Sequence, residues 1–228
     1  MLNIRGHADK SYDRELQELC DAILKMGEGV LYLLQLARQA LQKPDSQLVE
    51  EAKFRDREIN RLDLNIEEQA TLIMTRRQPF MEELRFITSA IKMSTELERI
   101  GDMAKNTVKR SAKLTQAIPE NTLQVLLSMV DLVQSMIEET LAVFKEFDGS
   151  RARKIWENDD KVDDIYKSLF HNLQADMVRN PSDAATFTHV IFAAKNLERI
   201  GDHATSLAKI IYYVNSGEKV IKEKIPTA

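Results

Sequence analysis

One hexapeptide occurs twice in this chain of 228 residues, at a spacing of 100. Leu97–Asp102 and Leu197–Asp202 both read Leu-Glu-Arg-Ile-Gly-Asp. Two shorter matches precede it in the same order in each half: Arg77-Gln78-Pro79 with Arg179-Asn180-Pro181, and Asp56-x-x-Ile59-Asn60 with Asp159-x-x-Val162-Asp163. A repeat at one spacing indicates a duplicated structural unit, here of about 105 residues. We expect a first unit over residues 1–117 and a second over residues 118–228.

The pattern of helix-breaking residues predicts that each unit is helical. Gly (7) and Pro (5) are scarce, while residues that favour helices are abundant. Between the breakers we expect six long helices: from Asp9 or Ser11 to about Lys43, 46–77, from Pro79 to about Gln116, from Pro119 or Asn121 to Asp148, 150–179 and 181–215. No stretch alternates polar and apolar residues as a strand would. Long helices with short links fold back as antiparallel neighbours, so the sequence predicts an all-α protein of two tandem three-helix bundles.

Charge and composition exclude several classes of partner. The net charge of −4 gives no basic surface for nucleic acid. The single Cys20 excludes an internal disulfide and is typical of a reducing compartment, and the first residues do not resemble a signal peptide. The longest nearly uncharged run, 121–137, contains Asp131 and is amphipathic, so it is expected to be a core helix and not a membrane span. We therefore expect a cytoplasmic protein without direct membrane insertion.

The repeated hexapeptide places two acids on one helical face. Glu98 and Asp102 are four residues apart, as are Glu198 and Asp202, and like charges at this spacing repel by roughly 0.2–0.5 kcal/mol. Each pair lies on or beside an apolar stripe. A carboxylate on a buried face needs a cation or good hydrogen bonds.

The hairpin geometry predicts further acidic neighbours. In an antiparallel hairpin, residues equally far from the turn lie at the same height. Around the turn at Gln78-Pro79, Asp56 is then level with Asp102 and Asn60 with Glu98. Around Asn180-Pro181, Asp159 is level with Asp202 and Asp163 with Glu198. Such oxygen clusters favour hard cations (magnesium, manganese, calcium or iron) over structural zinc. Glu28, and Glu138 or Glu139, are weaker candidates to join them.

A second interpretation of the acids needs no metal. Acidic residues on long helices commonly face water or pair with basic side chains. Five cations are available as partners: Arg85, Arg99, Lys105, Arg199 and Lys209. The glycines inside the two motifs, Gly101 and Gly201, are costly in a helix and indicate close approach of a neighbouring helix or a ligand.

The sequence resembles the PhoU family over nearly its whole length. The resemblance is carried by both Leu-Glu-Arg-Ile-Gly-Asp segments and by four further stretches: 77–79, Glu-Glu-Leu-Arg at 82–85, Asp-Asp-Lys-Val-Asp at 159–163, and Tyr-Tyr-Val at 212–214. The resemblance implies two similar three-helix bundles, often dimeric. In some members the acidic motifs bind metal clusters, which implies a metal role here for Asp56, Asn60, Glu98, Asp102, Asp159, Asp163, Glu198 and Asp202.

The same resemblance implies a regulatory function. The family negatively regulates the phosphate regulon and phosphate uptake, coupling the ATPase subunit of the phosphate ABC transporter to the sensor histidine kinase PhoR. It implies a non-enzymatic cytoplasmic adaptor, peripheral to the inner membrane through its partners, with magnesium, manganese or iron as cofactor. Two alternatives stay open at this point: a metal-dependent hydrolase, in which metal activates water, and a metal-free helical scaffold.

Overall fold

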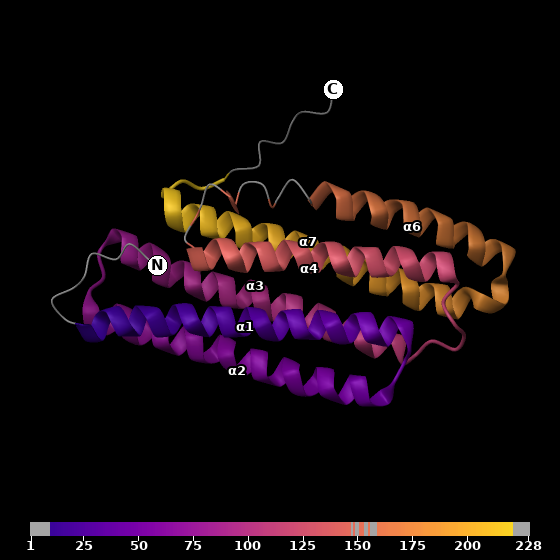
Figure 1. Ribbon diagram of the computed structural model, residues 1–228, viewed down its shortest axis with the longest axis horizontal. Helices are drawn as coiled ribbons and strands as arrows, with labels where there is room; N and C mark the ends of the chain where they lie inside the picture. The colour runs from indigo at the N-terminus through magenta and orange to yellow at the C-terminus, as the bar shows by residue number, and fades with distance from the viewer. Residues whose placement is uncertain (1–9, 147, 149–150, 153–154, 156–158, 221–228) are drawn as a thin grey trace, which may run out of the picture.

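The computed structural model describes residues 10–146, 148, 151–152, 155 and 159–220. Its elements are α1 (Lys10–Gln42), α2 (Ser46–Arg77), α3 (Met81–Ser111), α4 (Glu120–Glu146), α6 (Asp159–Arg179), the short 3₁₀ helix η2 (Pro181–Asp183) and α7 (Ala184–Ser216). No strand occurs among these described residues. The long helices run along one common direction, with α1, α2 and α3 on one side and α4, α6 and α7 on the other (Figure 1). The prediction of an all-α protein with two three-helix bundles is confirmed.

Local sequence explains the ends of the helices in the first bundle. The side chain of Asp45 accepts a hydrogen bond from the backbone N–H of Gln47 at 2.8 Å and so caps the start of α2. Gln78 takes the left-handed conformation (φ 48°) and ends α2 at the expected turn. Glu83 accepts a hydrogen bond from the backbone N–H of Phe80 at 2.9 Å, which holds the start of α3. The antiparallel hairpin of α2 and α3 therefore begins where Gln78-Pro79 predicted it.

The link between the bundles differs from the expectation. We predicted that the third helix would continue to about Gln116, but α3 ends at Ser111. The backbone then tightens, because Lys113 N–H donates to Arg110 and Leu114 N–H to Ser111. Ile118 further along is buried. Burial of this apolar residue holds the linker on the core and turns the chain toward α4. The expected start of the fifth helix near residue 150 lies outside the described residues.

The two bundles pack through α3 and α7, which run antiparallel. Arg85 and Glu96 on α3 and Thr115 in the linker after it lie beside Gly217, His203 and Thr186 respectively. The partners on the second bundle thus run backwards along the chain. A second seam joins α1 to α4, where Arg38 contacts Asp131 at 2.5 Å. One hydrophobic core runs through both bundles. The expected boundary after residue 117 falls in the linker, and it stays a prediction because the shared core does not divide there.

Candidate functional site

The acids of the first bundle meet around a lysine. Asp56 on α2 and Asp102 on α3 both accept hydrogen bonds from the ammonium of Lys105, at 2.9 and 2.6 Å. Asp102 also accepts from the side-chain amide of Asn106 at 2.9 Å. Asp56 is buried, at 7% exposed. The two aspartates therefore lie at one height on neighbouring helices, as the hairpin argument predicted. We name Asp56, Asp63, Glu98, Asp102 and Lys105 the Lys105 cluster.

Electrostatics place Glu98 in the same cluster. Burial raises the pKa of Glu98, and the negative charges of Asp102, Asp63 and Asp56 raise it further, while Arg99 lowers it. For Lys105, burial would lower the pKa, but hydrogen bonds to Asp102 and Asp56 and their charges raise it on balance. The ammonium is thus held in its charged form. The cluster carries four acids and one internal cation.

Asp63 takes the position expected for Asn60. Asn60 is exposed, whereas Asp63 accepts a hydrogen bond from Ser94 on α3 at 2.6 Å. Successive helical residues are about 100° apart, so Asp63 lies about 20° from Asp56 around α2 and Asn60 about 40° to the other side. That rotation turns Asn60 toward solvent. The spacing of seven from Asp56 is the sequence signal that could have identified Asp63.

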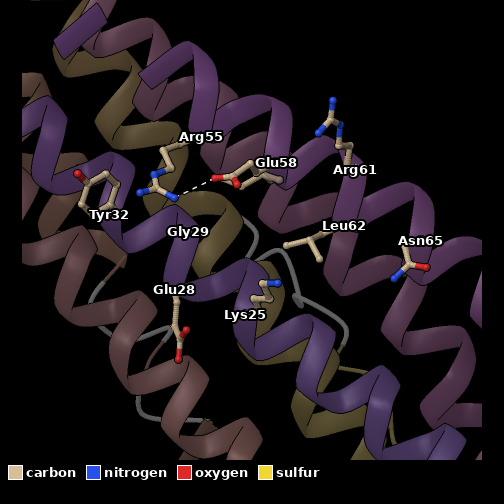
Figure 2. A pocket seen from close by; sticks show the side chains of 10 residues that line it. Lys25, Glu28, Gly29, Tyr32, Arg55, Glu58, Arg61, Leu62 and Asn65 are labelled. Atoms are coloured by element: carbon tan, nitrogen blue, oxygen red, sulfur yellow. Dashed lines mark hydrogen bonds and ion pairs between the residues drawn. The ribbon is translucent and has the colours of Figure 1, made fainter. Parts of the chain in front are cut away.

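The weaker candidate Glu28 belongs to a different feature. A hollow of about 580 Å³ lies between α1 and α2, and Figure 2 shows Glu28 and Lys25 from α1 with Arg55, Glu58, Arg61 and Asn65 from α2 around it. Arg55 donates to Glu58 at 2.9 Å and lies 4.8 Å from the centre of the Tyr32 ring. The charges lining this hollow are of both signs.

Ile59 lines that hollow and packs against both neighbouring helices. Its side chain, 1% exposed, contacts glycines of both neighbouring helices. A Cβ on Gly29 of α1 would lie 3.3 Å from Ile59, and a Cβ on Gly101 of α3 would lie 3.1 Å from it. The expected reason for Gly101, close approach of a neighbouring helix, is confirmed. Glu28 lines the hollow between α1 and α2, so its place in an oxygen cluster with Glu98 and Asp102 stays a prediction.

The matching acids of the second bundle are arranged differently. The carboxylate of Glu198, 12% exposed, lies 2.6 Å from the ammonium of Lys195. Asp202 is exposed, and Asp163 lies 4.0 Å from Lys167. Asp159 begins α6, but its side chain lies outside the described part of the chain. The exposed Glu138 accepts from Gln134 at 2.8 Å, so it is engaged within α4.

The position that matches Lys105 in the second motif is Thr205. Both residues follow the motif aspartate by three positions. Thr205 is 3% exposed, and its hydroxyl has no hydrogen-bond partner among the described residues. At this position the first unit has a cation and the second a buried hydroxyl. The cation that pairs with the second motif is Lys195, three positions before Glu198.

The fit of a metal ion differs between the two units. Within the described residues, no group of three or more His, Cys, Asp or Glu side chains is gathered to hold one. In the first unit an ammonium already lies where the two aspartates converge, so the residues as arranged do not fit a metal. In the second unit Glu198 is also paired with an ammonium, but Lys195 contacts this one carboxylate among the described residues and its side chain is 44% exposed. The other donors there are carboxylate oxygens and a buried hydroxyl, a chemistry that fits a hard cation. The eight residues expected to bind metal stay a prediction.

No described helix is apolar enough over a sufficient length to cross a bilayer.

Comparison with known proteins identifies relatives across the whole fold. The family model described as the PhoU domain matches twice, at residues 23–111 and 126–211. The phosphate-specific transport system accessory protein PhoU homolog of Caulobacter vibrioides is 36% identical over 96% of this chain and 95% of its own length. The homolog of Rhizobium meliloti is 34% identical over 93% and 90%.

Solved structures agree with these relatives. PhoU from Pseudomonas aeruginosa superposes with a TM-score of 0.87 at 32% identity, covering 91% of this chain and 100% of that one. The phosphate transport system regulatory protein PhoU from Streptococcus pneumoniae gives a TM-score of 0.84 at 26% identity, with coverage of 92% and 99%. The two matched segments each contain one Leu-Glu-Arg-Ile-Gly-Asp motif, which supports duplication of one unit.

Proposed function

The chain belongs to the PhoU family, and on this premise we propose that it is an accessory protein of a phosphate-specific transport system. The single observation that carries the proposal is likeness over the entire fold: relatives named as such accessory proteins match more than nine-tenths of this chain at 34–36% identity. In this role the chain negatively regulates phosphate uptake and the phosphate regulon. It does so by contacting the ATPase subunit of the transporter and the sensor histidine kinase PhoR.

Several large apolar side chains are exposed and offer positions where a partner protein could pack. Phe80 and Met81, at the tip of the α2–α3 hairpin, are 81% and 80% exposed, and Val178 at the corresponding end of α6 is 82% exposed. Further exposed apolar residues are Phe54, Leu64, Leu72, Leu84 and Phe192. Contiguous apolar patches mark surfaces that meet partners, so these side chains are the positions at which partner contact is to be tested. The protein would then be cytoplasmic, would be held at the inner membrane through the transporter, and would act as a homodimer.

The metal part of the proposal concerns the second unit. Glu198, Asp202 and Asp163, with Asp159, would supply oxygen ligands for magnesium, manganese or iron once the half-exposed Lys195 had released Glu198, and Thr205 adds a buried hydroxyl. A bound ion would neutralise carboxylates that otherwise repel and would stabilise the folded form by linkage. In the first unit, Asp56, Glu98 and Asp102 could take an ion only if Lys105 moved away.

One alternative function is favoured by a specific observation. The ion pairs of Lys105 give the first cluster its cation without metal, as a metal-free helical scaffold would require. Removing metal with a chelator distinguishes a metal-bound regulator from a metal-free scaffold. Loss of thermal stability after chelation supports the metal-bound regulator, whereas an unchanged melting temperature and unchanged partner binding support the scaffold.

Direct binding tests the regulatory proposal. The full chain is immobilised, and the purified ATPase subunit of the host's phosphate transporter and the cytoplasmic part of the kinase are passed over it separately. Saturable binding of both is expected. The ATPase subunit of an unrelated ABC transporter from the same host is the control. Absence of binding to both proteins, with the chain folded by circular dichroism, would contradict the proposal.

A further inference from the structure

Each unit of the chain places two acids on one face of a helix, and the residues around these acids differ between the units. In each motif an acid lies four residues before an aspartate on one face of a helix. In the first unit the residue three positions after that aspartate is Lys105, and in the second it is Thr205. The six motif residues are identical, but the residues around them differ at this position and at others, among them Thr95 in the first unit against Lys195 in the second. Among the described carboxylates Lys195 contacts only Glu198, and it is 44% exposed, whereas Lys105 is held by two carboxylates.

Two carboxylates from different helices bind the Lys105 ammonium, as they would bind a metal ion. Its ammonium touches a carboxylate on its own helix, Asp102, and reaches across to a carboxylate on α2, Asp56. Its side chain is 16% exposed and that of Asp56 10%. Both are largely removed from water, so each needs the other to satisfy its charge.

An ammonium and a divalent ion cannot share this position. The metal would need oxygens of Asp56 and Asp102 at about 2.0–2.6 Å, the same oxygens that now accept hydrogen bonds from Lys105. Their charges would also repel at contact distance. A metal ion could enter only after Lys105 had left, and Lys105 is held by two carboxylates.

We propose that Lys105 is a built-in cation that excludes divalent metal from the first unit, so that metal binding by this chain is confined to the second unit. For the second unit this inference rests on the proposed function. For the first unit it rests on the ion pairs of Lys105 alone. The chain would then have one metal site, in the second unit, although it has two acidic motifs.

The test isolates the first unit. Glu198→Gln and Asp202→Asn together remove the motif acids of the second unit and serve as the background. In this background Lys105 is retained, replaced by the residue of the other unit (Lys105→Thr), replaced by a neutral side chain of similar length (Lys105→Gln), or replaced by another cation (Lys105→Arg). Bound Mn²⁺ is measured by the loss of the free-ion electron paramagnetic resonance signal, and the melting temperature is measured with and without Mn²⁺.

The proposal predicts that the background chain and Lys105→Arg bind no Mn²⁺ in the first unit. Lys105→Thr and Lys105→Gln should bind one Mn²⁺ per chain, and Mn²⁺ should raise their melting temperatures. One bound Mn²⁺ in the background chain with Lys105 present would overturn the proposal. So would a folded Lys105→Gln or Lys105→Thr chain that gains no Mn²⁺ affinity.

A separate variant tests metal binding by the second unit independently of metal exclusion by Lys105. Asp56→Asn with Asp102→Asn removes the first cluster and leaves the second intact. Bound Mn²⁺ in this chain supports metal binding by the second unit. Its absence would refute that part of the proposed function and, with it, the confinement of metal to the second unit, while the exclusion of metal by Lys105 would still be decided by the four-chain comparison.

Discussion

His203 on α7 and Glu96 on α3 form a polar contact across the seam between the two bundles, with the His203 Nδ1 atom 2.5 Å from a Glu96 carboxylate oxygen. The two side chains are 14% and 23% exposed. Nearby, the side-chain amide of Asn196 lies 3.4 Å from the hydroxyl of Thr107 on the same seam. The helices that carry the two acidic motifs are therefore joined to each other by side chains as well as by the core.

Removing this contact should loosen the seam. His203→Ala leaves a largely buried carboxylate without its partner, and we expect a loss of about 1–3 kcal/mol in the free energy of unfolding. Urea unfolding measures it. His171→Ala, an exposed histidine on α6, is the matched control and should change stability by less than about 0.5 kcal/mol. Equal effects of the two substitutions would show that the seam contact contributes nothing.

The two aspartates that hold Lys105 should differ in their contribution to stability. Asp56→Asn weakens a pair in which both side chains are largely buried, and we expect a cost of about 1–3 kcal/mol. The Asp102 side chain is 47% exposed, so Asp102→Asn should cost less than about 1 kcal/mol. Urea unfolding of the two single variants measures the order. A larger loss for Asp102→Asn would contradict the burial argument.

Glu98 should make stability depend on pH. Burial, followed by the charges of Asp102, Asp63 and Asp56, raises its folded-state pKa above the ordinary value of 4.5. The folded state therefore holds the Glu98 proton more tightly than the unfolded state. This stabilisation is complete below the ordinary pKa and is lost as pH rises through the raised pKa. We expect Glu98→Gln to be more stable than the parent at about pH 7, with the advantage disappearing at about pH 4. An advantage that is the same at both pH values would exclude titration of Glu98 as its source.

Two left-handed positions give stability changes of opposite sign. Gly217 ends α7 with φ of 76°, and a Cβ there would also collide with the Arg85 guanidinium. Gly217→Ala should therefore destabilise by about 1–2 kcal/mol. Gln78 ends α2 with φ of 48°, so Gln78→Gly should relieve strain and stabilise by up to about 1 kcal/mol. Thermal unfolding of both variants measures the pair, and shifts of the same sign would contradict the assigned backbone conformations.

Cys20 should be unreactive in the folded chain. Burial raises the pKa of its thiol to about 11, and the residue is 4% exposed. Because the thiolate is the reactive form, a disulfide-exchange reagent should not label Cys20 at about pH 8 in the native protein. The same reagent should label it fully in denaturant. Rapid labelling of the native chain would mean that α1 opens locally.

The sequence predicted the helices, their hairpins and the shared height of Asp56 and Asp102, because these follow from breaker positions and from counting residues away from a turn. The sequence did not predict which acidic or amide side chain of α2 faces α3, because this depends on the rotation of α2 about its own axis. Asn60 and Asp63 are three residues apart, yet only Asp63 contacts α3, and the exact phase of α2 could not be read from its acidic pattern.

The end of α3 and the cation of the first cluster depend on tertiary packing. Ile118 is apolar and lies just before Pro119, but nothing in its local sequence shows that it is buried or that α3 ends at Ser111. Lys105 was one of five basic residues named as partners for the acids, and only the packing of α2 against α3 selects it. In the second unit, the exposure of Asp202 beside the largely buried Glu198 likewise depends on how α6 and α7 are packed.

The output of the phosphate-starvation response in the host tests the central claim, that this chain restrains phosphate signalling, most directly. The gene is deleted, and a phosphatase reporter of the response is measured in phosphate-rich medium, with and without a plasmid copy of the chain. We predict high reporter activity in the deletion strain and repression when the chain is restored. Full repression in the deletion strain, with no change on restoring the chain, would contradict the account.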